Sequence, residues 1–233
     1  MTLSPASISA AYFSGYQDGT TTLTSAITNG SVTTPIQVAD TSGFSASGFI
    51  LIGDEIIQYT TKTATTFDGT ITRGVKGTSG SGHALGSYVT EIAATTSTTA
   101  TGMIIDTVTL SNGITCTVPD TKIYFTRTGI YNIQFSAQLL NFSTAEDNVT
   151  IWLRVDGSDI PMSAGVVEVL PKHGSNPGAV ISTWNYVDTY TAGSYFELYW
   201  NATGNAVLGT YPPGTSPTRP GAPSVILTVT QVA

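Results

Sequence analysis

Residues 129–168 read GIYNIQFSAQLLNFSTAEDNVTIWLRVDGSDIPMSAGVVE, and two runs within them alternate strictly between apolar and polar side chains. In the first run the apolar set starts at Tyr131 and returns at every second position as far as Leu139. The second run does the same from Val149 to Val155. Successive side chains of a strand point to opposite faces of its sheet, so each run predicts a strand with one buried face. Such strands are typical of antiparallel sheets, and the stretch predicts an all-β fold.

Outward from this stretch, residues 102–233 predict a two-sheet jelly roll of about eight strands. Turn signals such as Asn112-Gly113 and Asp156-Gly157 separate the alternating segments. The expected strands lie near residues 103–109, 114–118, 122–126, 131–139, 149–155, 179–188, 195–200 and 224–231.

The rest of the chain predicts three further regions. Residues 1–30 have too few apolar side chains for a core of their own and are expected to form an extended arm. Residues 31–92 predict a small β-module, in which Gly53-Asp54 suits a type II′ hairpin turn. Residues 93–101, AATTSTTAT, are expected to be a linker that joins the module to a self-folding C-terminal knob, residues 102–233.

Composition restricts the classes of function. Charged residues make up 10% of the chain, against roughly 25% in ordinary soluble domains. So few charges suggest that much of the surface faces protein, with a neutral secreted β-protein as the alternative. The net charge of −7 and the lack of a basic patch argue against nucleic-acid binding. We expect no membrane span, no secretion signal and a buried, unreactive thiol at Cys116.

The sequence offers little evidence for catalysis, a metal or a cofactor. His83 and His173 lie in separate Gly-rich loops without carboxylates at metal-ligand spacing. No GxSxG motif is present, although the sequence leaves a Ser–His–Asp arrangement open. The acidic pairs Glu146-Asp147 and Asp156/Asp159 would suit a glycosidase, but solvated turn residues are the favoured interpretation. We therefore assign no catalytic, cofactor-binding or metal residue.

The glycine-rich loop RGVKGTSGSGHALG, residues 73–86, does not predict a phosphate site. The motif GxxxxGK[ST] is absent, and the glycines miss the GxGxxG spacing. We expect no nucleotide to bind there.

Short motifs spread over nearly the whole of residues 102–233: Gly129-Ile130-Tyr131, Phe135-Ser136-Ala137-Gln138, Trp152-Leu153-Arg154, GSDIP at 157–161, Trp184-Asn185-Tyr186, AGSYFEL at 192–198 and PSVIL at 223–227. Together they resemble the C1q/TNF-like jelly roll of tailed-phage virion proteins. Ser194 departs from the pattern, since related sequences often carry Asp there. The collagen repeat of animal C1q proteins is also missing, which favours the phage branch.

A second resemblance covers the module. Its residues are Gly48, Ile52-Gly53-Asp54-Glu55, Tyr59-Thr60, Phe67, Gly69, Thr72-Arg73-Gly74, Gly77-Thr78, His83, Gly86 and Val89. They are similar to a short β-unit of phage tail, baseplate and fibre proteins, which implies a structural or connecting role.

The two resemblances imply a non-enzymatic virion protein, assembled in the cytoplasm of a host bacterium, that forms a homotrimer. We expect a capsid cement or decoration protein, whose partners are the major capsid protein or other virion proteins. A tail fibre or receptor-binding protein, with a host surface glycan as partner, is the alternative. A glycan-degrading enzyme is the remote alternative.

Two sets of residues are expected to make the contacts. Aromatic and basic side chains on the polar faces of two strands predict the trimer interface, with aromatics covered by a loop as the alternative; they are Trp152, Arg154, Tyr195 and Tyr199. The apolar residues of the arm are expected to anchor the protein to the particle; they are Ile8, Tyr12, Phe13 and Tyr16.

Overall fold

The computed structural model describes residues 10–30 and 35–233. This part of the chain contains strands and turns but no helix, and its paired strands are antiparallel. The all-β prediction is confirmed.

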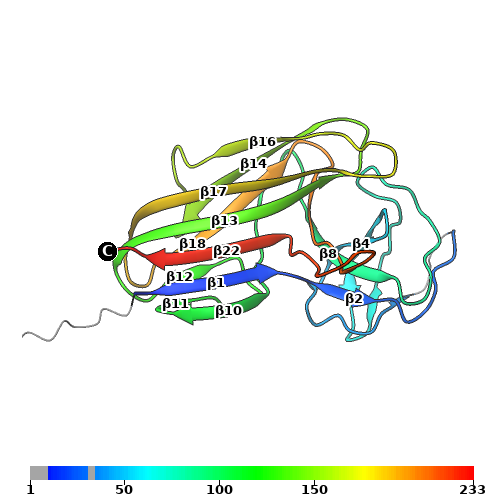
Figure 1. The fold of residues 1–233 in the computed structure, drawn as a ribbon, viewed down its shortest axis with the longest axis horizontal. Helices are drawn as coiled ribbons and strands as arrows, with labels where there is room; N and C mark the ends of the chain where they lie inside the picture. The colour runs from blue at the N-terminus through cyan, green and yellow to red at the C-terminus, as the bar shows by residue number, and fades with distance from the viewer. Residues whose placement is uncertain (1–9, 31–34) are drawn as a thin grey trace, which may run out of the picture.

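The first sheet has ten strands in the described residues and runs the length of the molecule (Figure 1). Its order is β10–β1–β22–β13–β19–β8–β4–β5, with β17 paired to β13 and β2 paired to β8. The strands are β1 (Tyr12–Gln17), β2 (Thr20–Thr22), β4 (Gly48–Ile52), β5 (Glu55–Tyr59), β8 (Tyr88–Ala94), β10 (Thr107–Asn112), β13 (Gly129–Asn141), β17 (Gly178–Tyr190), β19 (Val207–Gly209) and β22 (Val225–Gln231).

The second sheet has seven strands in the order β11–β12–β18–β14–β15, with β16 paired to β14 and β9 to β18. They are β9 (Thr101–Gly102), β11 (Ile114–Thr115), β12 (Ile123–Phe125), β14 (Asp147–Val155), β15 (Ser158–Asp159), β16 (Gly165–Val169) and β18 (Tyr195–Ala202). Two smaller pairings complete the fold: a sheet of β3 (Ile36–Gln37), β6 (Thr61–Lys62) and β7 (Thr66–Asp68), and a hairpin of β20 (Gly214–Thr215) and β21 (Thr218–Arg219).

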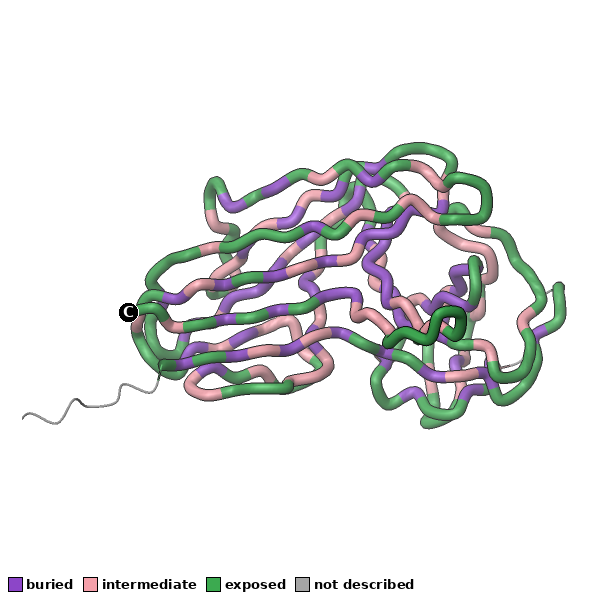
Figure 2. The backbone as a smooth tube through the Cα atoms, in the orientation of Figure 1, coloured by how far each residue is buried: buried purple, intermediate pink, exposed green. Residues whose placement is uncertain are grey.

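The main core lies between the second sheet and the part of the first sheet formed by β10, β1, β22, β13 and β17. We call these two packed layers the sandwich. Figure 2 shows buried and exposed residues alternating along its strands. The alternating runs of the sequence supply this core, because Tyr131 to Leu139 and Val149 to Leu153 bury their odd-numbered side chains. Trp200 is fully buried among them.

The module packs against the sandwich as part of the same body. Its own core contains the rings of Phe44, Tyr59 and Phe67, whose centroids lie 4.7–5.0 Å apart in the two pairs made with Phe67. A further buried cluster joins the two halves, since it combines Leu51 and Ile92 of the module with Leu140 of β13. Backbone pairing also crosses the boundary, from β13 through β19 to β8.

The predicted hairpin at Gly53-Asp54 is present between β4 and β5, where Ile52 pairs with Glu55. Gly53 has φ +59°, which a type II′ turn requires at its first central position and which glycine adopts without a steric penalty.

The structure differs from the predicted arm. Residues 12–17 form β1, which lies between β10 and β22 in the sandwich. Phe13 is buried in the main core, and β2 pairs with β8 of the module. Both partners of β1 are distant in the sequence, β10 in the middle of the chain and β22 near its end. Local sequence therefore did not indicate that this segment completes a core formed elsewhere.

The predicted linker is also replaced by ordered structure. β8 continues to Ala94, Thr95 is buried, and Thr96 and Thr99 bridge across a turn. The Oγ1 of Thr95 accepts a hydrogen bond of 2.8 Å from the backbone N–H of Ala202 in β18. Residues 93–101 are therefore a tight connection between packed halves.

The structure contains the strands predicted for residues 102–233, but one of them is shifted and several short strands are additional. The strand expected at 103–109 is β10, at Thr107–Asn112. The strands that were not predicted are β15, β16, β19, β20 and β21. Of these, β16 and β19 pair with the longer strands β14 and β13.

Replacing Phe13 with alanine should lower the free energy of unfolding by about 3–5 kcal/mol, because a buried aromatic side chain leaves a cavity. The neighbouring Ser14→Ala, on the opposite face of β1, should change it by less than about 0.5 kcal/mol. Chemical denaturation of the full chain measures both. Equal and small effects would show that residues 12–17 act as a detached arm.

Candidate functional site

The four predicted interface residues lie together on the outward face of the second sheet. Strand pairing places Trp152 opposite Tyr199 and Arg154 opposite Glu197. Tyr195 lies two residues before Glu197 on β18, on the same face of the sheet. Their neighbours along each strand face the core, as the alternation predicted.

Three of these side chains are already partnered within the chain. The indole N–H of Trp152 donates a hydrogen bond of 2.8 Å to Oδ1 of Asp159. The guanidinium of Arg154 lies 4.5 Å from the ring centroid of Tyr199, and its Nη2 donates to the carbonyl of Gly157. The rings of Trp152 and Tyr199 are themselves 5.9 Å apart.

The remaining position, Tyr195, belongs to the same network. Its ring lies 4.8 Å from the ammonium of Lys122 and 5.3 Å from the ring of Tyr124. Between Tyr195 and Tyr199, the buried Glu197 accepts a hydrogen bond from the hydroxyl of Thr121. Charges of both signs therefore lie on this face, and the chain satisfies much of their bonding internally.

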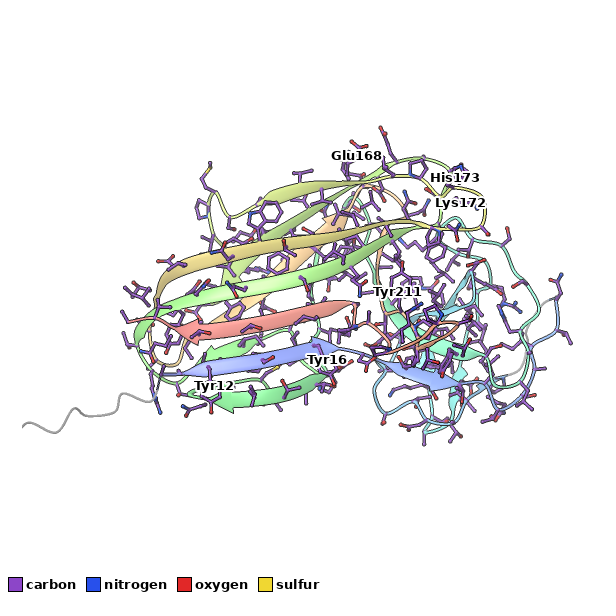
Figure 3. The ribbon with its side chains drawn as sticks, in the orientation of Figure 1. Tyr12, Tyr16, Glu168, Lys172, His173 and Tyr211 are labelled. Atoms are coloured by element: carbon purple, nitrogen blue, oxygen red, sulfur yellow. The ribbon has the colours of Figure 1, made fainter. Side chains whose placement is uncertain are left out.

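The predicted anchoring residues do not form one surface. Tyr12 and Tyr16 point outward along β1, where Figure 3 labels them. Phe13 points into the main core, so the prediction that it contacts the particle is wrong. Ile8 lies outside the described residues.

The outward face of the first sheet differs sharply from that of the second. The strands β10, β1, β22, β13 and β17, all within the described part of the chain, contain a single charged residue, Asp188. Asp188 is in register with the core residue Tyr131, so its strand position belongs to the inward face. We call the outward surface of these five strands the charge-free face.

Large apolar side chains are exposed on this charge-free face. Ile226 of the central strand β22 is 44% exposed, and strands and chain segments on both sides of it contribute further residues. These are Tyr12, Leu110, Ile130, Ile181 and Val187. Around them are threonine, serine, asparagine and glutamine, which can pair with a protein surface without a large desolvation penalty. An exposed apolar surface depleted of charge is typical of the centre of a protein interface.

Sequence reasoning missed this face because it searched for aromatic residues on polar strand faces. A second signal was present in the sequence. This signal is the lack of charged residues in alternating segments: β13, β17 and β22 contain one charged residue between them. The strands β14 and β18 of the other sheet contain three, which are Asp147, Arg154 and Glu197.

The glycine-rich loop of the module is organised around one buried carboxylate, Glu55. Both Nε and Nη2 of Arg73 donate to it, and Nε2 of His83 lies 2.7 Å from its Oε2. The backbone N–H groups of Gly74 and Ser81 also donate to it, at 3.1 and 3.0 Å. Glu55 therefore fixes both ends of the loop between residues 74 and 81.

This cluster contains serine, histidine and a carboxylate, yet it does not have the geometry of a nucleophilic relay. Both contacts of His83 involve the same nitrogen: Nε2 lies 2.7 Å from Glu55 and 3.5 Å from Oγ of Ser81. A catalytic triad instead uses one ring nitrogen for the acid and the other for the nucleophile. The cluster's evident role is to hold the loop in place.

No cluster of three or more histidine, cysteine, aspartate or glutamate side chains suited to a metal ion occurs among the described residues. Within residues 10–30 and 35–233 there is also no helix long and apolar enough to cross a membrane. Cys116 is half-buried, and burial, with a smaller contribution from Asp120, raises the pKa of its thiol to about 11. Little thiolate forms at neutral pH, so this thiol is a weak nucleophile.

The chain matches no protein-family model, and no curated protein is significantly similar to it in sequence.

Glu55→Gln should lower the free energy of unfolding by about 3 kcal/mol or more, because it leaves the largely buried Arg73 guanidinium without its counter-charge. The adjacent Asp54→Asn, an exposed turn position, is the matched control and should change stability little. Urea denaturation followed by fluorescence measures both. A stable Glu55→Gln protein would contradict the structural role of this carboxylate.

The stabilisation by Glu55 should also depend on pH. Burial alone raises the pKa of this carboxyl, but hydrogen bonds from Arg73, Ser81 and His83 outweigh burial and hold the pKa below its ordinary value of 4.5. The folded state therefore binds its proton less readily than the unfolded state, so the contribution is complete above that value and is lost as the pH falls through the folded pKa. The stability difference between the parent and Glu55→Gln should shrink between about pH 5 and pH 3. A difference that is constant over this range would contradict the assignment.

Proposed function

We propose that this protein is a non-enzymatic structural protein of a tailed-phage virion, and that its copies form a trimer through the charge-free face. The observation that carries the proposal is the exposed apolar surface of β10, β1, β22, β13 and β17, which has no charged residue at an outward strand position.

The order of the strands supports the jelly-roll part of this proposal. Along the chain, β1, β13, β17 and β22 enter the first sheet, while β12, β14, β16 and β18 enter the second. The neighbours are β1–β22–β13–β17 in one sheet and β12–β18–β14–β16 in the other. Eight strands divided between two packed sheets in this way are typical of jelly rolls.

Two physical arguments favour association through the first sheet over the second. Burying the second sheet would remove Lys122, Arg154 and Asp159 from water although their partners lie within the same chain, so little new interaction would offset the desolvation. Burying the charge-free face removes apolar surface at no such cost.

A capsid cement or decoration protein remains our preferred role. A trimer fits local threefold positions of a capsid lattice, and the chain has few charges, which suits a subunit enclosed by other proteins. Tyr12 and Tyr16 lie on the charge-free face, so we assign them to the trimer contact and not to the particle anchor. A tail fibre or receptor-binding protein is the second candidate, favoured by the resemblance of the module to units of tail proteins.

Ile226→Asp should weaken the trimer at least about 30-fold, which corresponds to about 2 kcal/mol for a charge buried at the centre of an interface. The matched control is Val166→Asp, which places the same charge at an exposed apolar position of the second sheet. Light scattering over a dilution series gives the mass of each protein. A monomeric parent, or dissociation by Val166→Asp alone, would contradict the proposed interface.

The position in the particle is tested by quantitative mass spectrometry of purified virions that carry this protein. A cement protein should be present in a fixed ratio to the major capsid protein, and capsids that lack it should disassemble at lower temperature, because bound protein stabilises by mass action. A small copy number, with loss of host adsorption and unchanged capsid stability, would instead assign the protein to the tail.

A further inference from the structure

Two adjoining hollows lie where the module meets the sandwich. The larger has a volume of about 420 Å³ and the smaller about 350 Å³. They share a wall made of Gly53, Gly82 and His83, and we call the combined depression the trough. Its size is within the range of small-molecule sites.

The walls of the trough are held in place by interactions already described. Glu55 fixes the glycine-rich loop and the ring of His83. The opposite wall is the loop between β16 and β17, where Figure 3 labels Lys172 and His173. The backbone N–H of Lys172 donates to the carbonyl of Ser143, and His173 pairs with Asn176. The trough is therefore preformed, which lowers the entropic cost of binding.

Polar side chains from both halves of the molecule line the larger hollow. Asp54 on the β4–β5 turn and the ammonium of Lys172 on the opposite loop both line it, and neither side chain makes a hydrogen bond or ion pair within the described residues. The hydroxyls of Ser79 and Ser175 line the same hollow and are likewise unpaired there. A ligand would find one acceptor, one cationic donor and two hydroxyl groups.

The smaller hollow supplies a different kind of surface. Tyr88, 39% exposed, lines it together with Leu51 and Pro212. An aromatic ring beside a row of hydrogen-bonding groups suits a ligand that has both an apolar face and a polar edge. A pyranose ring has this character, because its axial C–H groups stack on aromatic rings while its hydroxyls pair with carboxylates and ammonium groups.

We propose that the trough binds a short neutral saccharide, with Asp54 and Lys172 bonding its hydroxyls and Tyr88 packing against a neighbouring sugar ring. A phosphate ligand is less suitable, because Asp54 opposes the charge of Lys172 and no helix N-terminus lies at the site among the described residues. A purely apolar ligand would leave both charges desolvated. The inference does not depend on the trimer or on a place in a virion.

The test uses the full chain and a panel of neutral trisaccharides of glucose, galactose and N-acetylglucosamine, followed by saturation-transfer NMR and calorimetry. At least one should bind with a dissociation constant of about 1 mM or lower. Asp54→Asn and Lys172→Ala should each weaken that binding about fivefold or more, as expected for loss of one hydrogen bond. Tyr88→Ala should weaken it similarly.

Two matched controls keep the result interpretable. Glu146→Gln changes an exposed carboxylate outside the trough, and Leu85→Ala removes an exposed apolar side chain near Tyr88; both should bind like the parent. No binding by any trisaccharide, or unchanged affinity in the three trough variants, would overturn the proposal. Displacement of the saccharide by inorganic phosphate would also overturn it in favour of an anion site. Light scattering of the same samples reports the oligomer separately, so failure here is distinguishable from failure of the proposed assembly.

Discussion

The architecture depends on the pairing of one long strand, β13. It pairs with β17 along all of its length, with β22 over its first half and with β19 near its end. Its odd-numbered residues fill the main core, while Leu140 at its end enters the cluster shared with the module. A shift of one residue in this strand would reverse both faces at once, so its alternation sets the register of sandwich and module together.

That single register also produces the contrast between the two outer surfaces. The odd positions of β13 are committed to the core, and its outward positions carry no charge; the outward positions of β22 and β17 are also uncharged. Among these outward residues, Ile130, Ile181 and Ile226 are exposed. On the second sheet, by contrast, Arg154, Glu197 and Lys122 are combined with tyrosine rings in one internally bonded surface. One outer surface therefore exposes apolar side chains without charge, whereas the other pairs its charges within the chain. Our proposal that the protein is a subunit of an assembly rests on this asymmetry.

The sequence predicted those features that depend on local patterns. Alternation identified β13, β14 and β18 and their buried faces, and the Gly53-Asp54 turn was recognised from its leading glycine. Features that depend on distant pairing were beyond its reach. Nothing within residues 12–17 indicates that β22 will lie beside them, and nothing in residues 93–101 indicates that Thr95 will bond to β18. The internal partners of the predicted interface residues were out of reach for a related reason. The contacts of Trp152 with Asp159 and of Lys122 with the ring of Tyr195 exist only after the strands have paired.

The central claim is that the charge-free face lies against neighbouring copies of the chain, and its most direct test is an electron cryomicroscopy structure of the full-length protein in solution. The account predicts three copies around a threefold axis, with β1, β22, β13 and β17 of each copy facing the axis and the second sheet facing solvent. A trimer built through Trp152, Arg154, Tyr195 and Tyr199, or a monomer whose charge-free face is open to water, would contradict it.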